Sequence, residues 1–99
     1  MAEADRMKPL FIPLKKKFWE QFRDGTKDTE YRRRGPRWNL DTCQLGRQVV
    51  LSCGYSGARL TGTIIGASYH TIPESIPGWV ECYGRGAGDA VCIKISLHR

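Results

Sequence analysis

Basic side chains are concentrated in one short part of this 99-residue chain. Residues 15–37 hold nine Lys and Arg against four Asp and Glu, an excess of five, and the whole chain has a net charge of +6. If this part includes a strand, neighbouring side chains point to opposite faces, so at least one of Arg32, Arg33 and Arg34 should face the interior or a cleft. An arginine there needs a carboxylate or a phosphate as its partner. The cluster therefore predicts recognition of an anion, with nucleic-acid phosphate the first candidate.

Each feature of this cluster also has a purely structural interpretation. Glu30 and Arg32 share one strand face at a spacing of two, so they can pair with each other. Lys27 points to the opposite face, beside Tyr31, which offers a stacking surface. Residues 15–17 are three lysines that open a predicted helix, where the helix dipole disfavours cations, and a solvated charged face is the simpler interpretation. The basic candidates for ligand binding are Lys15, Lys16, Lys17, Lys27, Arg32, Arg33, Arg34 and Arg37.

The second half of the chain adds a few candidates. The loop over residues 84–89 is rich in glycine, and its successive N–H groups, with Arg85, can cradle an anion; a hairpin connection explains the glycines equally well. Trp79 and Tyr83 can stack on bases or pack in the core. Trp38 can lie over a cleft or close the end of a barrel. His70 fits a hydrogen-bonded structural role.

The cysteines indicate no metal centre. Cys43, Cys53, Cys82 and Cys92 form no close pair of the kind that structural zinc sites use, and we expect no metal and no cofactor. We expect buried, unreactive thiols without disulfides.

The elements that must position these residues can also be predicted. Leu10–Ile12, between two prolines, is expected to be a short strand at an edge or in a barrel. Leu14, Phe18 and Phe22, at a spacing of four, predict a helix that ends at Gly25. Residues 27–34 should then form a strand that ends at Gly35-Pro36.

The remaining chain is expected to be mostly β-structure. A helical turn is predicted over residues 38–45, followed by strands over 49–53 and 60–67 around a turn at 54–57. Gly62 and Gly66 suggest bulges or sharp bending in the second of these strands. A long connection over residues 70–88 leads to the clearest strand, 91–97. About five strands and one good helix predict a small mixed β-barrel with helical elements on one side.

Length and composition limit the classes that remain. We expect a flexible tail over residues 1–8 and a single domain over residues 9–99. No apolar stretch is long enough for a membrane helix, and the polar, acidic start does not resemble a secretory signal. We therefore expect a cytoplasmic protein that does not contact a membrane.

One segment resembles a known motif. Residues 25–32, Gly-Thr-Lys-Asp-Thr-Glu-Tyr-Arg, fit GxKxxExR, the signature of the ASCH (activating-signal-cointegrator homology) domain family, which is related to PUA domains. A preceding helix that ends at the motif glycine, and a Gly-x-x-Val segment at residues 46–49, also resemble the family. The similarity extends over roughly residues 9–97. It implies an α+β fold, a small PUA-like barrel of five or six strands with one main helix, a short helical turn and a cleft between the barrel and the helices.

The resemblance also implies functions. The family is thought to bind RNA or other nucleic acids, with Lys27, Glu30 and Arg32 in or near the cleft. Some members remove the acyl group from N4-acetylcytidine, and others are reported to be nucleases. In the amidohydrolases the motif lysine, here Lys27, works with a threonine three positions later, where this chain has Glu30, and with a glutamate from a later loop, here Glu74 or Glu81.

Three hypotheses follow. The first is a module that binds RNA or another single-stranded nucleic acid, with Tyr31, Trp79 or Tyr83 stacking on bases. The second is an enzyme that acts on an acylated nucleoside, or a ribonuclease, with Lys27 as nucleophile or general base and Glu30, Glu74 or Glu81 as proton shuttle. The third is a protein-interaction domain that presents its basic face to an acidic partner.

Overall fold

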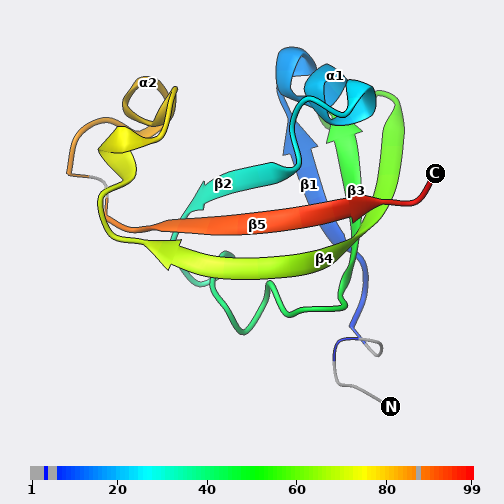
Figure 1. Ribbon diagram of the computed structural model, residues 1–99, viewed down its shortest axis with the longest axis horizontal. Coiled ribbons are helices and arrows are strands. Elements are labelled where there is room, and N and C mark those ends of the chain that lie inside the picture. Colours follow the sequence, from blue (N-terminus) through cyan, green and yellow to red (C-terminus); the bar gives the residue numbers. More distant parts are fainter. Residues whose placement is uncertain (1–3, 5–6, 87) are drawn as a thin grey trace.

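The protein folds around one curled five-stranded sheet. The computed structural model describes Ala4, residues 7–86 and residues 88–99. Most of the expected tail, residues 1–3 and 5–6, lies outside the described residues, while Ala4 is buried. The strands run in the order β1-β3-β4-β5-β2 (Figure 1). Their bounds are β1 (Leu10–Leu14), β2 (Thr29–Arg33), β3 (Gln48–Cys53), β4 (Arg59–His70) and β5 (Ala90–Leu97).

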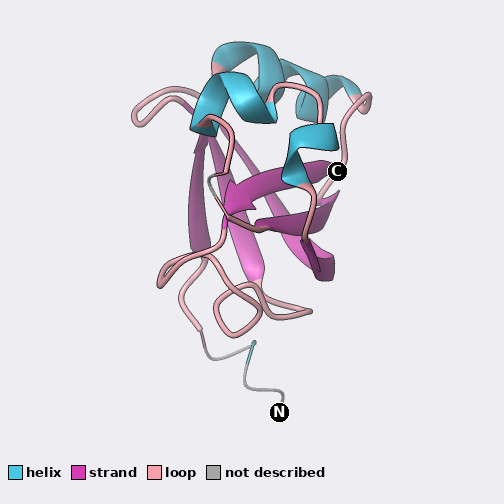
Figure 2. Ribbon diagram, turned by 90° about the vertical axis from the view of Figure 1, so that its left-hand side faces the viewer, coloured by secondary structure: helices cyan, strands magenta, loops and turns pink. Residues whose placement is uncertain are grey.

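The helical elements lie on one side of this sheet (Figure 2). The main helix, α1 (Lys16–Asp24), follows β1, and a short helix, α2 (Trp79–Tyr83), comes after the 3-10 turn η2 (Pro73–Ser75). Figure 1 shows α1 and α2 above different parts of the sheet, with β2 running between them. The expected α+β class with one main helix is confirmed. The sheet is a half-barrel, and among the described strands β1 and β2 are edges with no backbone ladder between them.

Helix α1 closes the main core. Its Trp19 and Phe22 are buried, and Trp19 Nε1 donates a hydrogen bond of 3.1 Å to the carbonyl of Leu51. Gly25 ends the helix, as expected, in the left-handed conformation with φ of 83°. The expectation that Leu14 begins the helical pattern is wrong: Leu14 is the last residue of β1 and pairs with Cys53. Pro13 does not end the strand, because an edge strand tolerates the missing N–H.

Strand β4 is long enough to pair with two other strands, β3 and β5. Its first half pairs with β3, and its whole length after Gly62 pairs with β5, with a register shift between Ile64 and Gly66. The bend that the two glycines suggested is confirmed by this irregularity. At Gly62 the chains approach so closely that an added Cβ would lie 2.7 Å from the carbonyl oxygen of Ser96.

Two connecting segments carry local structure. Residues 38–45 form bends and turns that include one helical turn, closed by a hydrogen bond of 2.9 Å from the Cys43 N–H to the Asn39 carbonyl. The Asn39 side-chain oxygen accepts hydrogen bonds from the N–H groups of Asp41 and Thr42 and so caps this turn. The long connection expected over residues 70–88 contains η2 and α2. These elements form because Ile76 and Trp79 bury themselves against Ala90 in a second, smaller core.

The cysteines are only partly as expected. All four are free, and Cys43 is buried. Cys53 and Cys92 are half-buried and Cys82 is exposed, so the expectation of burial is wrong for these three. Cys82 is exposed because it lies on the short helix α2, most of which is not buried.

Candidate functional site

A cleft lies above the open seam between β1 and β2. Its volume is about 370 Å³. The end of β1, the start of α1, strand β2 and helix α2 supply its walls. We call it the seam cleft, and its lining residues are Pro13, Leu14, Lys15, Phe18, Glu30, Tyr31, Arg32, Glu81, Cys82 and Tyr83.

A partly buried ion pair lies at the floor of the seam cleft. Arg32 Nε lies 2.8 Å from Glu30 Oε2, so the expected pairing of these two residues is confirmed. The Arg32 guanidinium also donates to the carbonyl of Pro13, and this hydrogen bond joins the two edge strands where no backbone ladder does. The guanidinium carbon of Arg32 lies 4.8 Å from the centre of the Trp38 ring. Arg32 is therefore the side chain that links β2 to β1.

Burial dominates the electrostatics of Glu30. The residue is 7% exposed, and its loss of water raises the pKa of the carboxyl above its ordinary value. Arg32 and Lys27 act in the opposite direction, because each stabilises the carboxylate. The result is a carboxyl group that takes up a proton more readily than a solvated glutamate does.

A smaller recess continues from the seam cleft toward α2. Its volume is about 60 Å³, and it shares Phe18, Glu30, Tyr31, Cys82 and Tyr83 with the cleft. We call it the recess, and its own additional lining residues are Lys27, Ile76, Pro77, Gly78 and Trp79.

Lys27 lines the recess, and its ammonium group lies close to three aromatic rings. Its Nζ lies 5.2 Å from the ring centre of Phe18, 5.2 Å from that of Tyr31 and 5.8 Å from that of Phe22. The expected position beside Tyr31 is confirmed. Loss of water lowers the pKa of the Lys27 amine, although the nearby carboxylates of Glu30 and Asp28 partly offset this effect. Lys27 is thus a cation held in apolar surroundings beside a buried carboxyl group.

The predicted site residues divide into those the fold brings together and those it keeps apart. Lys15, Glu30, Tyr31, Arg32 and Glu81 line the seam cleft, while Lys27 and Trp79 line the recess. The other basic candidates line neither space. Lys16 and Lys17 are exposed on α1, and Arg33 is exposed at the end of β2. The guanidinium carbon of Arg34 lies 3.8 Å from the ring centre of Tyr69, and that of Arg37 lies 5.8 Å from the ring centre of Trp38.

Of the two loop glutamates, Glu81 lines the seam cleft and Glu74 does not. Glu74 Oε1 instead accepts a hydrogen bond of 3.1 Å from the N–H of Gly86, which lowers the pKa of this carboxyl. The glycine loop thus directs one N–H group to a carboxylate of the same chain. Arg85 is exposed and lines neither the cleft nor the recess; Ala87 of this loop lies outside the described residues.

Sequence reasoning did not single out several contributors to the site, among them Phe18, Cys82 and the Pro13 carbonyl. Phe18 was expected only as part of a helix face, and Cys82 as a buried thiol, yet both line the cleft and the recess. The Pro13 carbonyl that Arg32 binds is 19 positions away in the chain. The spacing of Phe18 from Phe22 carried a signal for one apolar face, but nothing in the sequence indicated that the face extends into a cleft.

Within Ala4, residues 7–86 and residues 88–99, no three His, Cys, Asp or Glu side chains are grouped so that they could hold a metal ion. Over the same residues, no helix has the length and apolar character needed to cross a membrane.

The comparisons with known proteins bear on the fold. No protein-family model and no curated protein matches the chain. Crystal structures of the ASCH protein from Zymomonas mobilis do: the unmodified protein has a TM-score of 0.68 at 15% identity, over 90% of this chain and 67% of that one. Two mutants of it give TM-scores of 0.71 and 0.66, each at 16% identity, over 94% and 90% of this chain and 72% and 68% of theirs. The chain therefore has an ASCH-like fold.

Proposed function

We propose that this protein binds single-stranded RNA and holds one unstacked nucleotide in the seam cleft. The observation that carries the proposal is the combination of aromatic walls with a cation at the mouth of the cleft. Phe18, Tyr31 and Tyr83 supply the aromatic surface, and Lys15 supplies the cation. RNA-binding domains typically read single strands by stacking splayed bases on aromatic side chains.

The lysines at the start of α1, of which Lys15 lines the cleft, are available for phosphate. Among the described residues, Lys15, Lys16 and Lys17 form no ion pair with a carboxylate. Arg23, Arg34 and Lys94, by contrast, each lie within 4.0 Å of an aspartate or glutamate oxygen. The three lysines also open α1, where the helix dipole disfavours cations, so neutralisation by a phosphate would relieve an unfavourable arrangement.

The size of the cleft favours a single strand over a duplex. At about 370 Å³ it lies at the lower end of small-ligand sites, which hold roughly 300–1,000 Å³. Such a volume suits one nucleotide and excludes a double helix. The ASCH-like fold supports the same ligand class, since the family that the motif resembles is thought to bind RNA.

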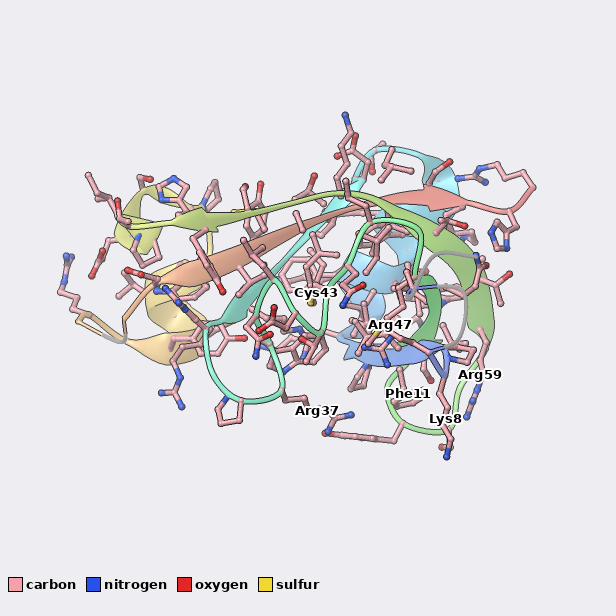
Figure 3. All side chains as sticks on the ribbon, turned by 90° about the horizontal axis from the view of Figure 1, so that it is seen from below. Lys8, Phe11, Arg37, Cys43, Arg47 and Arg59 are labelled. Atoms are coloured by element: carbon pink, nitrogen blue, oxygen red, sulfur yellow. The ribbon has the colours of Figure 1, made fainter. Side chains whose placement is uncertain are left out.

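Two lysines of equal charge test the proposal. Fluorescence anisotropy would compare a short single-stranded RNA with a DNA duplex of matched length, for the wild type, Lys15→Gln and Lys8→Gln. Lys15 lines the cleft, whereas Lys8 precedes β1 at the end of the sheet away from α1 (Figures 1 and 3). We expect preference for RNA and weaker binding in Lys15→Gln alone, with its salt slope reduced by about 0.7. Equal losses in both variants, or no RNA binding at low salt, would contradict the proposal.

A second candidate function rests on Lys27. An amine with a lowered pKa beside a carboxyl with a raised pKa is the pairing that acid–base catalysis needs. In hydrolysis of an acylated nucleoside, neutral Lys27 would take a proton from water, whose oxygen attacks the acyl carbon. The carbon–nitrogen bond then breaks, the leaving nitrogen takes the Glu30 proton, and transfer from Lys27 to Glu30 resets the pair.

Activity on N4-acetylcytidine tests this second function. The rate should pass through a maximum with pH and fall on both sides, because the reaction needs neutral Lys27 and protonated Glu30 at the same time. Lys27→Met should lose about 100-fold or more. An unchanged rate in this variant would remove Lys27 from the reaction.

A further inference from the structure

An aromatic and basic cluster lies outside the seam cleft, on the face of β1 that points away from the main core. Tyr55, in the turn between β3 and β4, is 79% exposed. Its ring centre lies 6.4 Å from that of Phe11. The guanidinium carbon of Arg59 lies 5.2 Å from the centre of the Phe11 ring, and Figure 3 shows both side chains. We call Phe11, Tyr55 and Arg59 the outer cluster.

The outer cluster has binding capacity that the fold leaves unused. Tyr55 is more exposed than any other large apolar side chain of the described residues, so its ring is open to a stacking partner. Among the same residues, no aspartate or glutamate oxygen lies within 4.0 Å of Arg59. Arg59 makes one long hydrogen bond of 3.5 Å, to the Tyr55 carbonyl, which leaves most of its five N–H donors free. A guanidinium group in this state suits a phosphate.

The register of the sheet connects Arg59 with the seam cleft. Pro13 pairs with Ser52 and Ser52 pairs with Arg59, so the three residues form one row across β1, β3 and β4. Residues paired in this way share one face of a sheet. Pro13 also lines the seam cleft, and two strand spacings, about 10 Å, separate its backbone from that of Arg59.

The turn that holds Tyr55 adjoins the cleft as well. The N–H of Gly54 donates a hydrogen bond of 2.8 Å to the carbonyl of Leu14, which lines the cleft. Lys15, the cation at the cleft mouth, is the next residue in the chain. The turn therefore lies at the end of the sheet nearest α1 (Figure 1), next to the residues that open the cleft.

We infer that the outer cluster is a second nucleotide-binding site, which takes a neighbouring nucleotide of the same RNA strand that enters the seam cleft. This inference rests on the proposed binding of RNA in that cleft. Tyr55 stacks on the base, and Arg59 donates hydrogen bonds to the phosphate. The strand crosses from β1 toward β4 at the end nearest α1, so Lys8, at the opposite end of β1, lies off its path (Figure 1).

A purely structural role for the outer cluster makes a different prediction. A guanidinium group over a ring stabilises a protein, so the cluster would then hold the hairpin of β3 and β4 together. In that case Tyr55→Ala would lower the thermal unfolding temperature and leave the affinity for RNA unchanged. A ligand contact predicts the reverse, because a side chain that is 79% exposed contributes little to the packing of the fold.

Matched substitutions test the inference. The affinity for labelled hexauridylate would be measured by fluorescence anisotropy over a range of salt concentrations. Tyr55→Ala should weaken binding by about tenfold, the loss of one stacked base, whereas Ile72→Ala, at an apolar side chain that is 66% exposed beyond β4, should not.

Arg59 has its own control in Arg85, which is exposed in the loop before β5 on the side of the molecule away from β1 (Figure 1). Arg59→Gln should reduce the salt slope by about 0.7, the value for one phosphate contact, and Arg85→Gln should leave it unchanged.

The results also separate the inference from the proposed function. Weaker binding in Lys15→Gln, with Tyr55→Ala and Arg59→Gln as tight as the wild type, would overturn the inference and leave the proposed function standing. Weaker binding in Tyr55→Ala and Arg59→Gln, with Lys15→Gln unaffected, would contradict the proposed function and keep the outer cluster as an RNA contact. Equal losses in Arg59→Gln and Arg85→Gln would overturn the inference, because the charge would then act without regard to place.

Discussion

At the scale of single residues, Glu30 and Arg32 act as one unit. Glu30 is buried, and its partner Arg32 holds β2 to β1 through the Pro13 carbonyl. A buried ion pair adds little stability compared with apolar residues, but removal of one partner leaves an uncompensated charge. The motif residues therefore have a structural role whether or not they contact a ligand.

This unit predicts a pH-dependent loss of stability. Arg32→Met should lower the free energy of unfolding by about 3 kcal/mol near neutral pH, because the Glu30 carboxylate stays buried without its cation. The pKa of Glu30 is already raised by burial, and Arg32 no longer lowers it in the variant. The folded state then binds a proton more readily than the unfolded state, so stability should recover as pH falls.

Urea unfolding at about pH 8 and about pH 5 measures this effect. The double variant Glu30→Leu/Arg32→Met is the control, and it should regain part of the lost stability at the higher pH because no charge remains buried. An equal deficit of Arg32→Met at both pH values would show that the lost Pro13 contact, rather than the Glu30 charge, is responsible.

The pairing of Glu30 with Arg32 was predictable because it depends on a spacing of two within one strand. The contact of Arg32 with Pro13 was not, because it depends on how the sheet curls and brings its two edges together. The burial of Trp79 is of the same kind. The sequence placed an aromatic residue near a glycine loop, but its burial in the smaller core is a property of the folded chain.

At the scale of elements, strand β4 determines the curvature that creates the seam. It pairs with both β3 and β5, and its two buried or half-buried glycines have different surroundings. An added Cβ at Gly62 would lie 2.7 Å from the Ser96 carbonyl oxygen and 2.9 Å from Ile95 Cγ2. At Gly66 the nearest atom would be Lys94 Cβ at 3.3 Å, on an exposed side chain.

The two glycines therefore predict different costs. Gly62→Ala should destabilise the protein by about 3 kcal/mol, because neither a carbonyl of the neighbouring strand nor a core isoleucine can move away easily. Gly66→Ala should change stability by no more than about 1 kcal/mol, because it also stiffens the unfolded chain. Thermal unfolding of both variants checks the difference. Similar losses of stability in the two variants would mean that β4 and β5 are not closely packed at Gly62.

Strand periodicity and the glycine at the end of α1 were enough to predict most of the elements. The prediction failed where long-range contacts determine local structure. Pro13 remains in a strand because β1 is an edge strand. Helix α2 forms because Trp79 packs against Ala90 in the smaller core. The helical turn within residues 38–45 depends on local bonding, in which the Asn39 side chain caps the turn.

At the scale of the whole molecule, the two helical elements and the two sheet edges meet at one place. α1 covers the main core and α2 covers the smaller one, and the seam cleft lies where these parts adjoin. Most of the excess charge lies in residues 15–37, which supply Lys15, Glu30 and Arg32 to this cleft. Under the proposed function, a nucleotide occupies this cleft.

The rate at which Cys82 is alkylated reports whether a nucleotide occupies the cleft. Cys82 is the exposed thiol that lines both the cleft and the recess, and Cys82→Ser identifies its share of the reaction with iodoacetamide. We expect saturating single-stranded RNA to slow alkylation of Cys82 several-fold and a DNA duplex at the same concentration to leave it unchanged. RNA that binds by anisotropy yet leaves the alkylation rate of Cys82 unchanged would place the nucleic acid outside the seam cleft and contradict the proposed function.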